Sequence, residues 1–167
     1  KCAMYSADNL MACRDSGFIN PGMGFDENTR FIHVAPLSHG TAMGYYVTLF
    51  SCFANITMNA LDLEEWCRVA EAERVTHSFL VPTVLYRLLE LQKASPRNFS
   101  SLRTLIYGAA PMSPTRLDDL VKTFGPIFVQ GYASTETAMF VAVLDKADHR
   151  TDSERAIKRL SSAGRVT

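Results

Sequence analysis

The sequence predicts an α/β fold with a mostly parallel sheet covered by helices on both faces. Short apolar runs alternate with helical patterns along the chain, which favours strands joined by right-handed crossovers. The runs are nearly continuous in apolar residues, as expected for strands that are buried on both faces. A chain of 167 residues that is 47% hydrophobic and 20% charged is long enough for one domain with a real core.

The predicted strands are rich in branched and aromatic residues and are bounded by turn residues. They cover residues 31–35, 55–60, 77–81, 102–107 and 127–130, and a last apolar run covers 139–144. The predicted helices between them cover residues 41–53, 63–74, 84–93 and 114–124. The first residues, through Cys13, resemble a helix already in progress, and residues 145–160 are predicted to be charged and exposed.

Two helix starts carry recognisable caps. Asp62 followed by Glu65 is typical of a capping box before the helix at 63–74. Thr83 is the predicted N-cap of the helix at 84–93, directly after Pro82.

The charge balance gives no support for binding to nucleic acid or to an anionic membrane. Lys and Arg total 17, as do Asp and Glu, so there is no electrostatic case for nucleic acid or an anionic membrane. Residues 31–61 contain no charged residue, but Pro36, Gly40 and scattered polar residues interrupt them, so we expect a buried strand, helix and strand rather than a transmembrane segment.

The four cysteines match no zinc pattern and are interpreted as reduced thiols of a cytoplasmic protein. Nothing in the sequence predicts an oligomeric state.

The segments that follow the predicted strands are chemically unusual. They read PLSHG at 36–40, PTV at 82–84, GAAPMS at 108–113 and GYASTET at 131–137. Parallel strands end at one edge of a sheet, and ligands of such sheets bind beyond that edge. We therefore expect one rim to gather His39, Gly108, Ala109, Ala110, Tyr132, Thr135 and Glu136.

The residue types at this rim suit a nucleoside triphosphate with Mg²⁺. Gly108 and the two alanines after it let a flat ligand approach the backbone. Tyr132 offers a ring face for a base, and Ser134 and Thr135 offer hydroxyls for phosphate oxygens. Glu136 offers a hard oxygen ligand for Mg²⁺, which usually bridges to phosphates.

Each segment also has a simpler interpretation. GYASTET alone could be a turn followed by a helix cap, and GAAPMS alone could be a helix entrance. His39 alone could be a core or loop histidine, and His33, inside a strand, is predicted to be structural. The predicted coincidence of the segments at one edge favours the site.

GAAPMS followed by a helix, a strand and GYASTET resembles the adenylate-forming enzymes: acyl-CoA synthetases, luciferase-type enzymes and adenylation domains of peptide synthetases. PLSHG resembles the PxxH segment of this family, and SAGRV resembles its S-x-G-x-P segment, with Val166 where proline is usual. Ala133 stands where the family commonly has glycine. The resemblance covers essentially the whole chain, as the middle of the large N-terminal domain.

The resemblance implies a two-step reaction on a small-molecule carboxylic acid. The carboxylate attacks the α-phosphorus of ATP to give an acyl-adenylate and pyrophosphate, and the thiol of coenzyme A then displaces AMP. By this analogy Thr135, Glu136 and His39 are catalytic, and Glu136 binds Mg²⁺. The implied nucleotide-binding residues are Gly108, Ala109, Ala110, Pro111, Gly131, Tyr132, Ala133, Ser134 and Thr135.

We expect residues 1–167 to be a single α/β segment of a larger AMP-binding domain. The resemblance places the phosphate loop before Lys1, and the ribose-binding aspartate, the hinge and a catalytic lysine after Thr167, so the isolated segment is predicted to have little activity. Loading of a carrier protein, or a non-catalytic nucleotide-binding module, are the alternatives.

A fatty acid is the first expectation for the substrate, and an aryl acid is the second. The apolar stretch at 40–60 could line an acyl pocket, but it is predicted to be mainly core. Its large side chains are Met43, Tyr45, Tyr46, Leu49 and Phe50.

Overall fold

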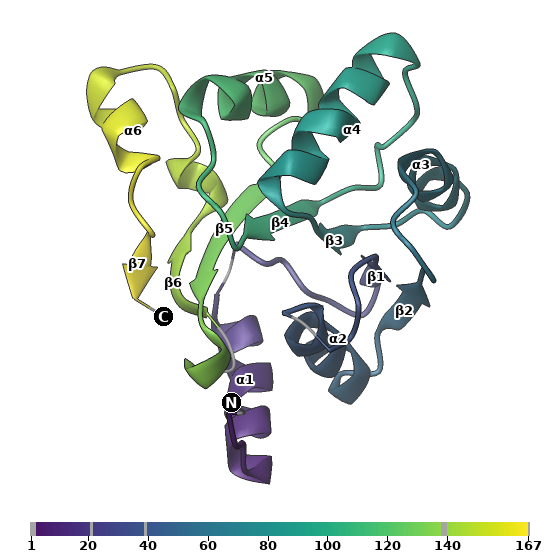
Figure 1. The fold of residues 1–167 in the computed structure, drawn as a ribbon, viewed down its shortest axis with the longest axis vertical. Coiled ribbons are helices and arrows are strands. Elements are labelled where there is room, and N and C mark those ends of the chain that lie inside the picture. The colour runs from purple at the N-terminus through teal and green to yellow at the C-terminus, as the bar shows by residue number, and fades with distance from the viewer. Residues whose placement is uncertain (1–2, 21, 39, 138–139, 167) are drawn as a thin grey trace.

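A computed structural model describes residues 3–20, 22–38, 40–137 and 140–166. Within them, seven strands form one sheet in the order β2-β1-β3-β4-β5-β6-β7 (Figure 1). Neighbours from β2 to β5 pair in parallel, whereas β6 and β7 are antiparallel, so the predicted mostly parallel sheet is confirmed. The strands are β1 Arg30–His33, β2 Ala54–Thr57, β3 His77–Phe79, β4 Thr104–Gly108, β5 Phe128–Ala133, β6 Phe140–Leu144 and β7 Arg165–Val166.

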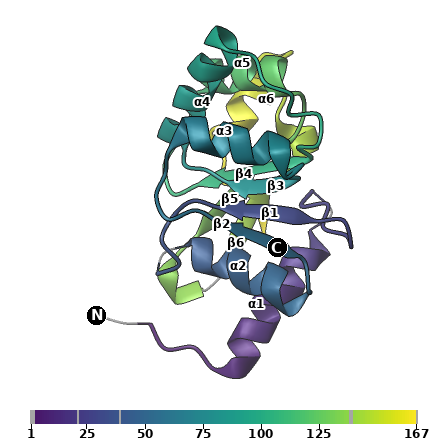
Figure 2. The same cartoon turned by 90° about the vertical axis from the view of Figure 1, so that its right-hand side faces the viewer.

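Helices cover both faces of this sheet, as predicted. Figure 2 shows α3, α4, α5 and α6 on one face, and α1 and α2 on the other. No helix in the described ranges is both long and apolar enough to cross a membrane. The helices are α1 Ala7–Ile19, α2 Thr41–Phe50, α3 Leu63–Ala72, α4 Pro82–Ala94, α5 Pro114–Phe124 and α6 Glu154–Arg159, with short 3₁₀ turns η1 Thr135–Thr137 and η2 Lys146–Asp148.

The two faces are packed differently. The α3–α5 face holds the main core, in which Trp66, Leu85 and Leu88 are fully buried. The α1–α2 face holds a smaller cluster around Met23, Phe31, Ile106, Val129 and Val143. This second face is where the structure leaves a cavity, described below.

The helix starts confirm one cap and correct two predictions. The Asp62 carboxylate accepts a hydrogen bond from the backbone N–H of Glu65, 3.1 Å away, so Asp62 is the N-cap of α3. Helix α4 starts at Pro82 and not after Thr83, because proline lacks the N–H that a first helical turn leaves unpaired. Helix α1 starts at Ala7, where the Ser6 side chain caps it, so the helix predicted through Cys13 is present from Ala7 onward but residues 3–6 precede it.

Strand β5 is longer than predicted. Its pairing continues through Gly131, which pairs with Gly108 of β4 on one side and with Val143 of β6 on the other. Tyr132 and Ala133 also belong to the strand, although the sequence predicted a loop from Gly131 onward. Gly131 has a partner strand on each side, and Tyr132 and Ala133 pair with β6, so backbone groups that a loop would have left to solvent are satisfied.

Part of the charged segment at 145–160 is buried, which corrects the prediction that it is exposed. Asp148 is only 6% exposed and His149 only 4% exposed. Arg159 of α6 donates a hydrogen bond to the Asp148 carboxylate at 2.8 Å. The charges of this segment therefore partly pair with one another over the sheet.

Candidate functional site

The segments after β4 and β5 lie side by side at the carboxyl edge of the sheet. Gly108 pairs with Gly131 across the two parallel strands. A Cβ atom added to Gly108 would lie 2.4 Å from the carbonyl oxygen of Gly131, so only glycine allows this approach. The predicted meeting of GAAPMS and GYASTET at one rim is confirmed.

The segment after β4 turns sharply away from the sheet. Ala109 has a φ of 64°, in the left-handed region that favours glycine. Ala109, Ala110 and Pro111 are all exposed. Backbone strain of this kind persists where the surrounding structure enforces it, and it concentrates at binding sites.

Tyr132 and its neighbours in β5 divide between the two faces of the sheet. The Tyr132 side chain is 57% exposed. Side-chain alternation places Tyr132 on the opposite face from Gly131, and the pairing with β6 becomes irregular between Tyr132 and Ala133. Gly131 and Ala133 line the cavity on the α1–α2 face, whereas Tyr132 does not line it.

The hydroxyl run after β5 forms a local turn. The Thr137 hydroxyl accepts a hydrogen bond from the Ser134 N–H at 3.1 Å and donates one to the Ser134 carbonyl at 3.0 Å. The simpler interpretation of GYASTET, a turn leading into a short helix, therefore holds locally. The turn also leaves Thr135 and Glu136 exposed at the rim.

Glu136 presents an ionised carboxylate to solvent. A hydrogen bond from its own backbone N–H, and a second from Ser134, lower the pKa of the Glu136 carboxyl. Among the described residues Glu136 forms no ion pair, and no group of three or more His, Cys, Asp or Glu could hold a metal ion. A magnesium ion here would have Glu136 as a protein ligand and would need water and phosphate oxygens besides, which is the coordination that Mg²⁺ prefers.

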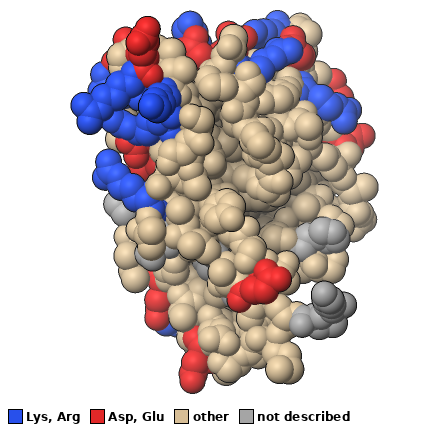
Figure 3. Space-filling model, turned by 60° about the vertical axis from the view of Figure 1, so that its left-hand side comes forward, with Lys and Arg blue, Asp and Glu red and all other residues tan. Residues whose placement is uncertain are grey.

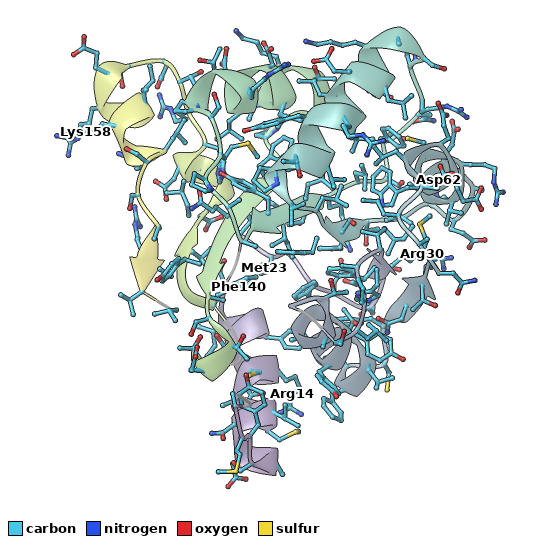
Figure 4. The ribbon with its side chains drawn as sticks, viewed as in Figure 1. Arg14, Met23, Arg30, Asp62, Phe140 and Lys158 are labelled. Atoms are coloured by element: carbon cyan, nitrogen blue, oxygen red, sulfur yellow. The ribbon has the colours of Figure 1, made fainter. Side chains whose placement is uncertain are left out.

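A mostly apolar cavity of about 480 Å³ lies between the sheet and α2 and reaches the rim. Met23 and Phe140 lie close together in its wall, from segments far apart in the sequence (Figure 4). On the face shown in Figure 3, Lys, Arg, Asp and Glu lie mainly around the edges. The cavity is lined by Tyr5, Met23, Phe25, Phe31, His33, Ser38, Gly40, Thr41, Ala42, Gly44, Val47, Phe79, Ile106, Ala109, Gly131, Ala133, Ser134, Thr135 and Phe140.

The structure corrects the sequence interpretation of the 40–60 stretch. None of its described large aromatic or leucine side chains lines the cavity, and Leu49 and Phe50 are 46% and 45% exposed, so they are not core either. Helix α2 instead turns Thr41, Gly44 and Val47 toward the cavity, at a spacing of three residues. The side chain of Met43 lies outside the described residues.

His33 is a cavity residue that the sequence interpretation missed. It lies two positions after Phe31 in β1, on the same face of the strand, and both rings line the cavity. The two rings stack with centroids 4.4 Å apart. Burial lowers the pKa of His33, so its ring is neutral at pH 7. The alternation of the strand pattern was the signal that could have placed His33 beside Phe31.

His39, the remaining predicted site residue, lies outside the described residues. Ser38 and Gly40, on either side of it in the sequence, both line the cavity. Of the other predicted residues, Gly108, Ala109 and Gly131 meet at the rim, as do Ala133, Ser134 and Thr135 at the edge of the cavity.

Comparison with known proteins gives a consistent answer. The family described as AMP-binding enzyme matches residues 1–167. The medium/long-chain-fatty-acid–CoA ligase FadD8 of Mycobacterium tuberculosis is 39% identical over 140 residues, which are 84% of this chain and 24% of that protein. A feruloyl-CoA synthase of an Amycolatopsis species is 36% identical over 149 residues, which are 88% of this chain and 30% of that protein. The chain thus spans less than a third of the length of these relatives.

The fold is similar to solved structures. The amide bond synthetase McbA from Marinactinospora thermotolerans superposes with a TM-score of 0.83 at 29% sequence identity, over 96% of this chain and 31% of that one. The match over the whole sequence, the relatives and the shared fold agree with the motifs at the rim. The chain belongs to the AMP-binding enzyme family.

Proposed function

We propose that these residues are the middle of the N-terminal domain of an ATP-dependent acid–CoA ligase whose substrate is a fatty acid. The parent enzyme converts the carboxylate and ATP into an acyl-adenylate and pyrophosphate, and then transfers the acyl group to the thiol of coenzyme A. The supporting observation is that the segments after β4 and β5 meet at one rim beside an apolar cavity, in a chain that is 39% identical to a medium/long-chain-fatty-acid–CoA ligase.

The nucleotide site of this proposal is the rim after β4 and β5. The exposed ring of Tyr132 stacks on adenine, and the backbone from Gly108 to Pro111 lines the base. Thr135, with Ser134 next to it, donates hydroxyl hydrogen bonds to phosphate oxygens.

Glu136 is the proposed ligand of Mg²⁺. Its carboxylate is exposed, ionised and without an ion pair among the described residues, which fits an ion that keeps several waters. When bound, Mg²⁺ neutralises charge on the phosphates. The contribution of the chain itself is to hold the reacting groups in place, with His39 proposed at the junction of the acyl and nucleotide pockets.

The proposed acyl site is the cavity beside β5. Ligand cavities of roughly 300–1,000 Å³ with apolar walls are typical of small-molecule sites, and this cavity measures about 480 Å³. Its apolar lining favours a fatty acid, and its aromatic residues keep an aryl acid as the second candidate. The relatives include one protein named for each class.

Pyrophosphate release tests the proposal. The full-length protein that carries these residues is incubated with ATP, Mg²⁺ and a panel of fatty and aryl acids. Release with fatty acids, and formation of acyl-CoA once coenzyme A is added, are expected. Release without transfer to coenzyme A would instead favour loading of a carrier protein, and ATP binding without release would favour a non-catalytic nucleotide-binding module.

Replacement of Glu136 tests the magnesium role. Glu136→Gln removes the charge but keeps the shape, and we expect pyrophosphate release to fall by roughly 100-fold or more, because charge stabilisation at the reacting phosphate is lost. Glu27→Gln, at an exposed position without an ion pair among the described residues, is the matched control and should leave the rate unchanged. Equal rates for the two variants would exclude Glu136 as a ligand of the ion.

The isolated segment gives a further test. We predict that residues 1–167 alone release little or no pyrophosphate, since the resemblance places the phosphate loop and the catalytic lysine outside them. Robust turnover by this segment would contradict its proposed place within a larger domain.

We also propose that the enzyme acts in the cytoplasm, which agrees with Cys13, Cys52 and Cys67 being free of disulfides.

A further inference from the structure

One hydroxyl group in the cavity wall has no hydrogen-bond partner among the described residues. It belongs to Thr41, the first residue of α2, which lines the cavity and is only 5% exposed. The described buried polar atoms that lack a partner and are also closed to solvent are nitrogens of His33, Trp66 and Arg103. The Thr41 hydroxyl is not among them, so it is open to the cavity. Buried polar groups are nearly always paired, so this hydroxyl points to a partner that the cavity can hold.

The start of α2 places unpaired backbone donors beside this hydroxyl. The first four N–H groups of a helix have no partner within the helix. The N-cap of α2 is Gly40, which has no side chain, and no side chain caps the helix. Gly40, Thr41 and Ala42 all line the cavity. Because a helix start also carries the positive end of the helix dipole, it favours an anion as the missing partner.

The rest of the cavity wall offers an anion no charged partner. Among the described residues that line the cavity, none is Asp, Glu, Lys or Arg. Burial of an anion in apolar surroundings is strongly unfavourable unless hydrogen bonds compensate for the lost water. An anion inside this cavity therefore depends on hydroxyl and N–H donors, and Thr41 and the start of α2 supply both.

The position of Thr41 favours the carboxylate of the acid as this anion. Strands β1 and β5 run in the same direction, since each pair of neighbours from β1 through β3 and β4 to β5 is parallel. The segment before α2 leaves β1 at its carboxyl end, as GYASTET leaves β5, so Thr41 lies toward the rim. Helix α2 joins β1 to the parallel strand β2 and so runs back along the sheet, with Gly44 and Val47 lining the cavity farther from the rim. An acid with its carboxylate at Thr41 would extend its chain past these two residues.

We propose that Thr41 and the N-terminus of α2 bind the carboxylate of the acid substrate. This rests on the proposed acid–CoA ligase function and adds the groups that hold the reacting end of the acid. The Thr41 hydroxyl donates a hydrogen bond to one carboxylate oxygen. The other oxygen attacks the α-phosphorus of ATP, and its bond to phosphorus forms as the bond to the pyrophosphate oxygen breaks. Pyrophosphate leaves with the electron pair, and the oxygen held by Thr41 becomes the carbonyl oxygen of the acyl-adenylate.

Equilibrium binding without ATP tests which part of the acid Thr41 contacts. The full-length protein is titrated with the acid that gives the fastest pyrophosphate release, and with the primary alcohol of the same chain, which carries no charge. Thr41→Val removes the hydroxyl but keeps the shape of the side chain. We expect it to raise the Kd of the acid by about 10-fold or more, and that of the alcohol by a smaller factor, because hydrogen bonds to charged groups are the stronger ones.

Two further variants separate the lost hydrogen bond from a disturbed fold. Thr41→Ser retains a hydroxyl and should recover most of the affinity for the acid. Thr83→Val is the matched control, because Thr83 also lies in the first turn of a helix but is exposed and does not line the cavity. It should leave the Kd of the acid and that of the alcohol unchanged.

A titration with ATP and Mg²⁺ separates the carboxylate from phosphate, the other anion proposed at this rim. We expect Thr41→Val to leave the Kd of ATP unchanged, and to raise the KM for the acid but not the KM for ATP in pyrophosphate release. A raised Kd of ATP with an unchanged Kd of the acid would overturn the inference in favour of a phosphate contact.

The outcomes distinguish this inference from the proposed function. An unchanged Kd of the acid in Thr41→Val, or an equal change for the acid and the alcohol, would overturn the role of Thr41 alone. No pyrophosphate release from any acid would overturn the proposed function together with this inference.

Discussion

Gly108 shows how a single residue positions the candidate site. It ends β4 with its Cα facing the Gly131 carbonyl of β5, at a separation that leaves no room for a side chain. The next residue, Ala109, then takes the left-handed conformation that turns the chain out over the rim. The sequence identified Gly108 as a point of close approach, and the structure shows that the neighbour it approaches is another strand.

Substitution of Gly108 by alanine tests this packing. A Cβ atom 2.4 Å from a backbone oxygen forces β4 and β5 apart. We expect Gly108→Ala to lower the free energy of unfolding by about 1–3 kcal/mol, as overpacking does elsewhere, and to weaken ATP binding. Urea unfolding and ATP titration measure the two effects.

Gly44 provides the matched control for this experiment. A Cβ atom at Gly44 would meet Phe31 at 3.6 Å, an ordinary contact, within helix α2. Gly44→Ala should therefore raise the free energy of unfolding, by up to about 1 kcal/mol. Equal destabilisation by both substitutions would mean that the close approach of Gly108 to β5 is not the cause.

At the scale of elements, the local signals in the sequence were reliable where they were short-range. Asp62 caps α3 as predicted, because the cap and the N–H that it accepts from are three residues apart. Strand β5 was predicted too short, since its last three residues are held by pairing with β6. This pairing depends on a second strand and not on residues within β5, so the residue pattern of β5 alone does not mark where the strand ends.

Removal of the α3 cap should lower the free energy of unfolding by the amount that is typical of a lost N-cap. Asp62→Ala leaves the Glu65 N–H without its acceptor, and we expect a loss of about 1 kcal/mol of unfolding free energy. Asp62→Asn retains a side-chain oxygen and should recover most of it. Urea unfolding of the unsubstituted protein and the two variants measures these differences. Identical midpoints would show that the cap contributes nothing to stability.

At the scale of the whole molecule, the sheet separates a densely packed face from a face with a cavity. Buried neutral histidines occur on several elements, including His33 in β1, His77 in β3 and His149 after η2. Burial lowers the pKa of all three, and that of His77 to about 4. In mild acid the three histidines therefore bind protons more readily in the unfolded chain than in the folded protein.

The lowered pKa values of the buried histidines predict that the free energy of unfolding falls in mild acid. The folded pKa of His77, about 4, lies below its ordinary value of 6.5, so the unfolded state binds more protons between these values. Stability should be complete above pH 6.5 and should fall as the pH drops from 6.5 toward 4. Urea unfolding at pH 7, 6, 5 and 4 measures this.

The Asp26 carboxylate should act only at lower pH. A hydrogen bond from Arg103 lowers the pKa of Asp26 to about 2, so its contribution is lost below the range of the histidines. A free energy of unfolding that stays constant between pH 6.5 and 4 would contradict neutral burial of the three histidines.

The sequence by itself determined the α/β class, the Asp62 cap of α3, and the motifs of the two rim segments, because these depend on periodicity and on residues a few positions apart. Only the tertiary structure decided the extent of β5, the burial of Asp148 and His149, and the lining of the cavity. His33 shows the reason: it contacts Asn55 and Phe31 and lines a cavity bounded by several separate segments. Those contacts form only when the chain packs, so no local pattern in the sequence encodes them.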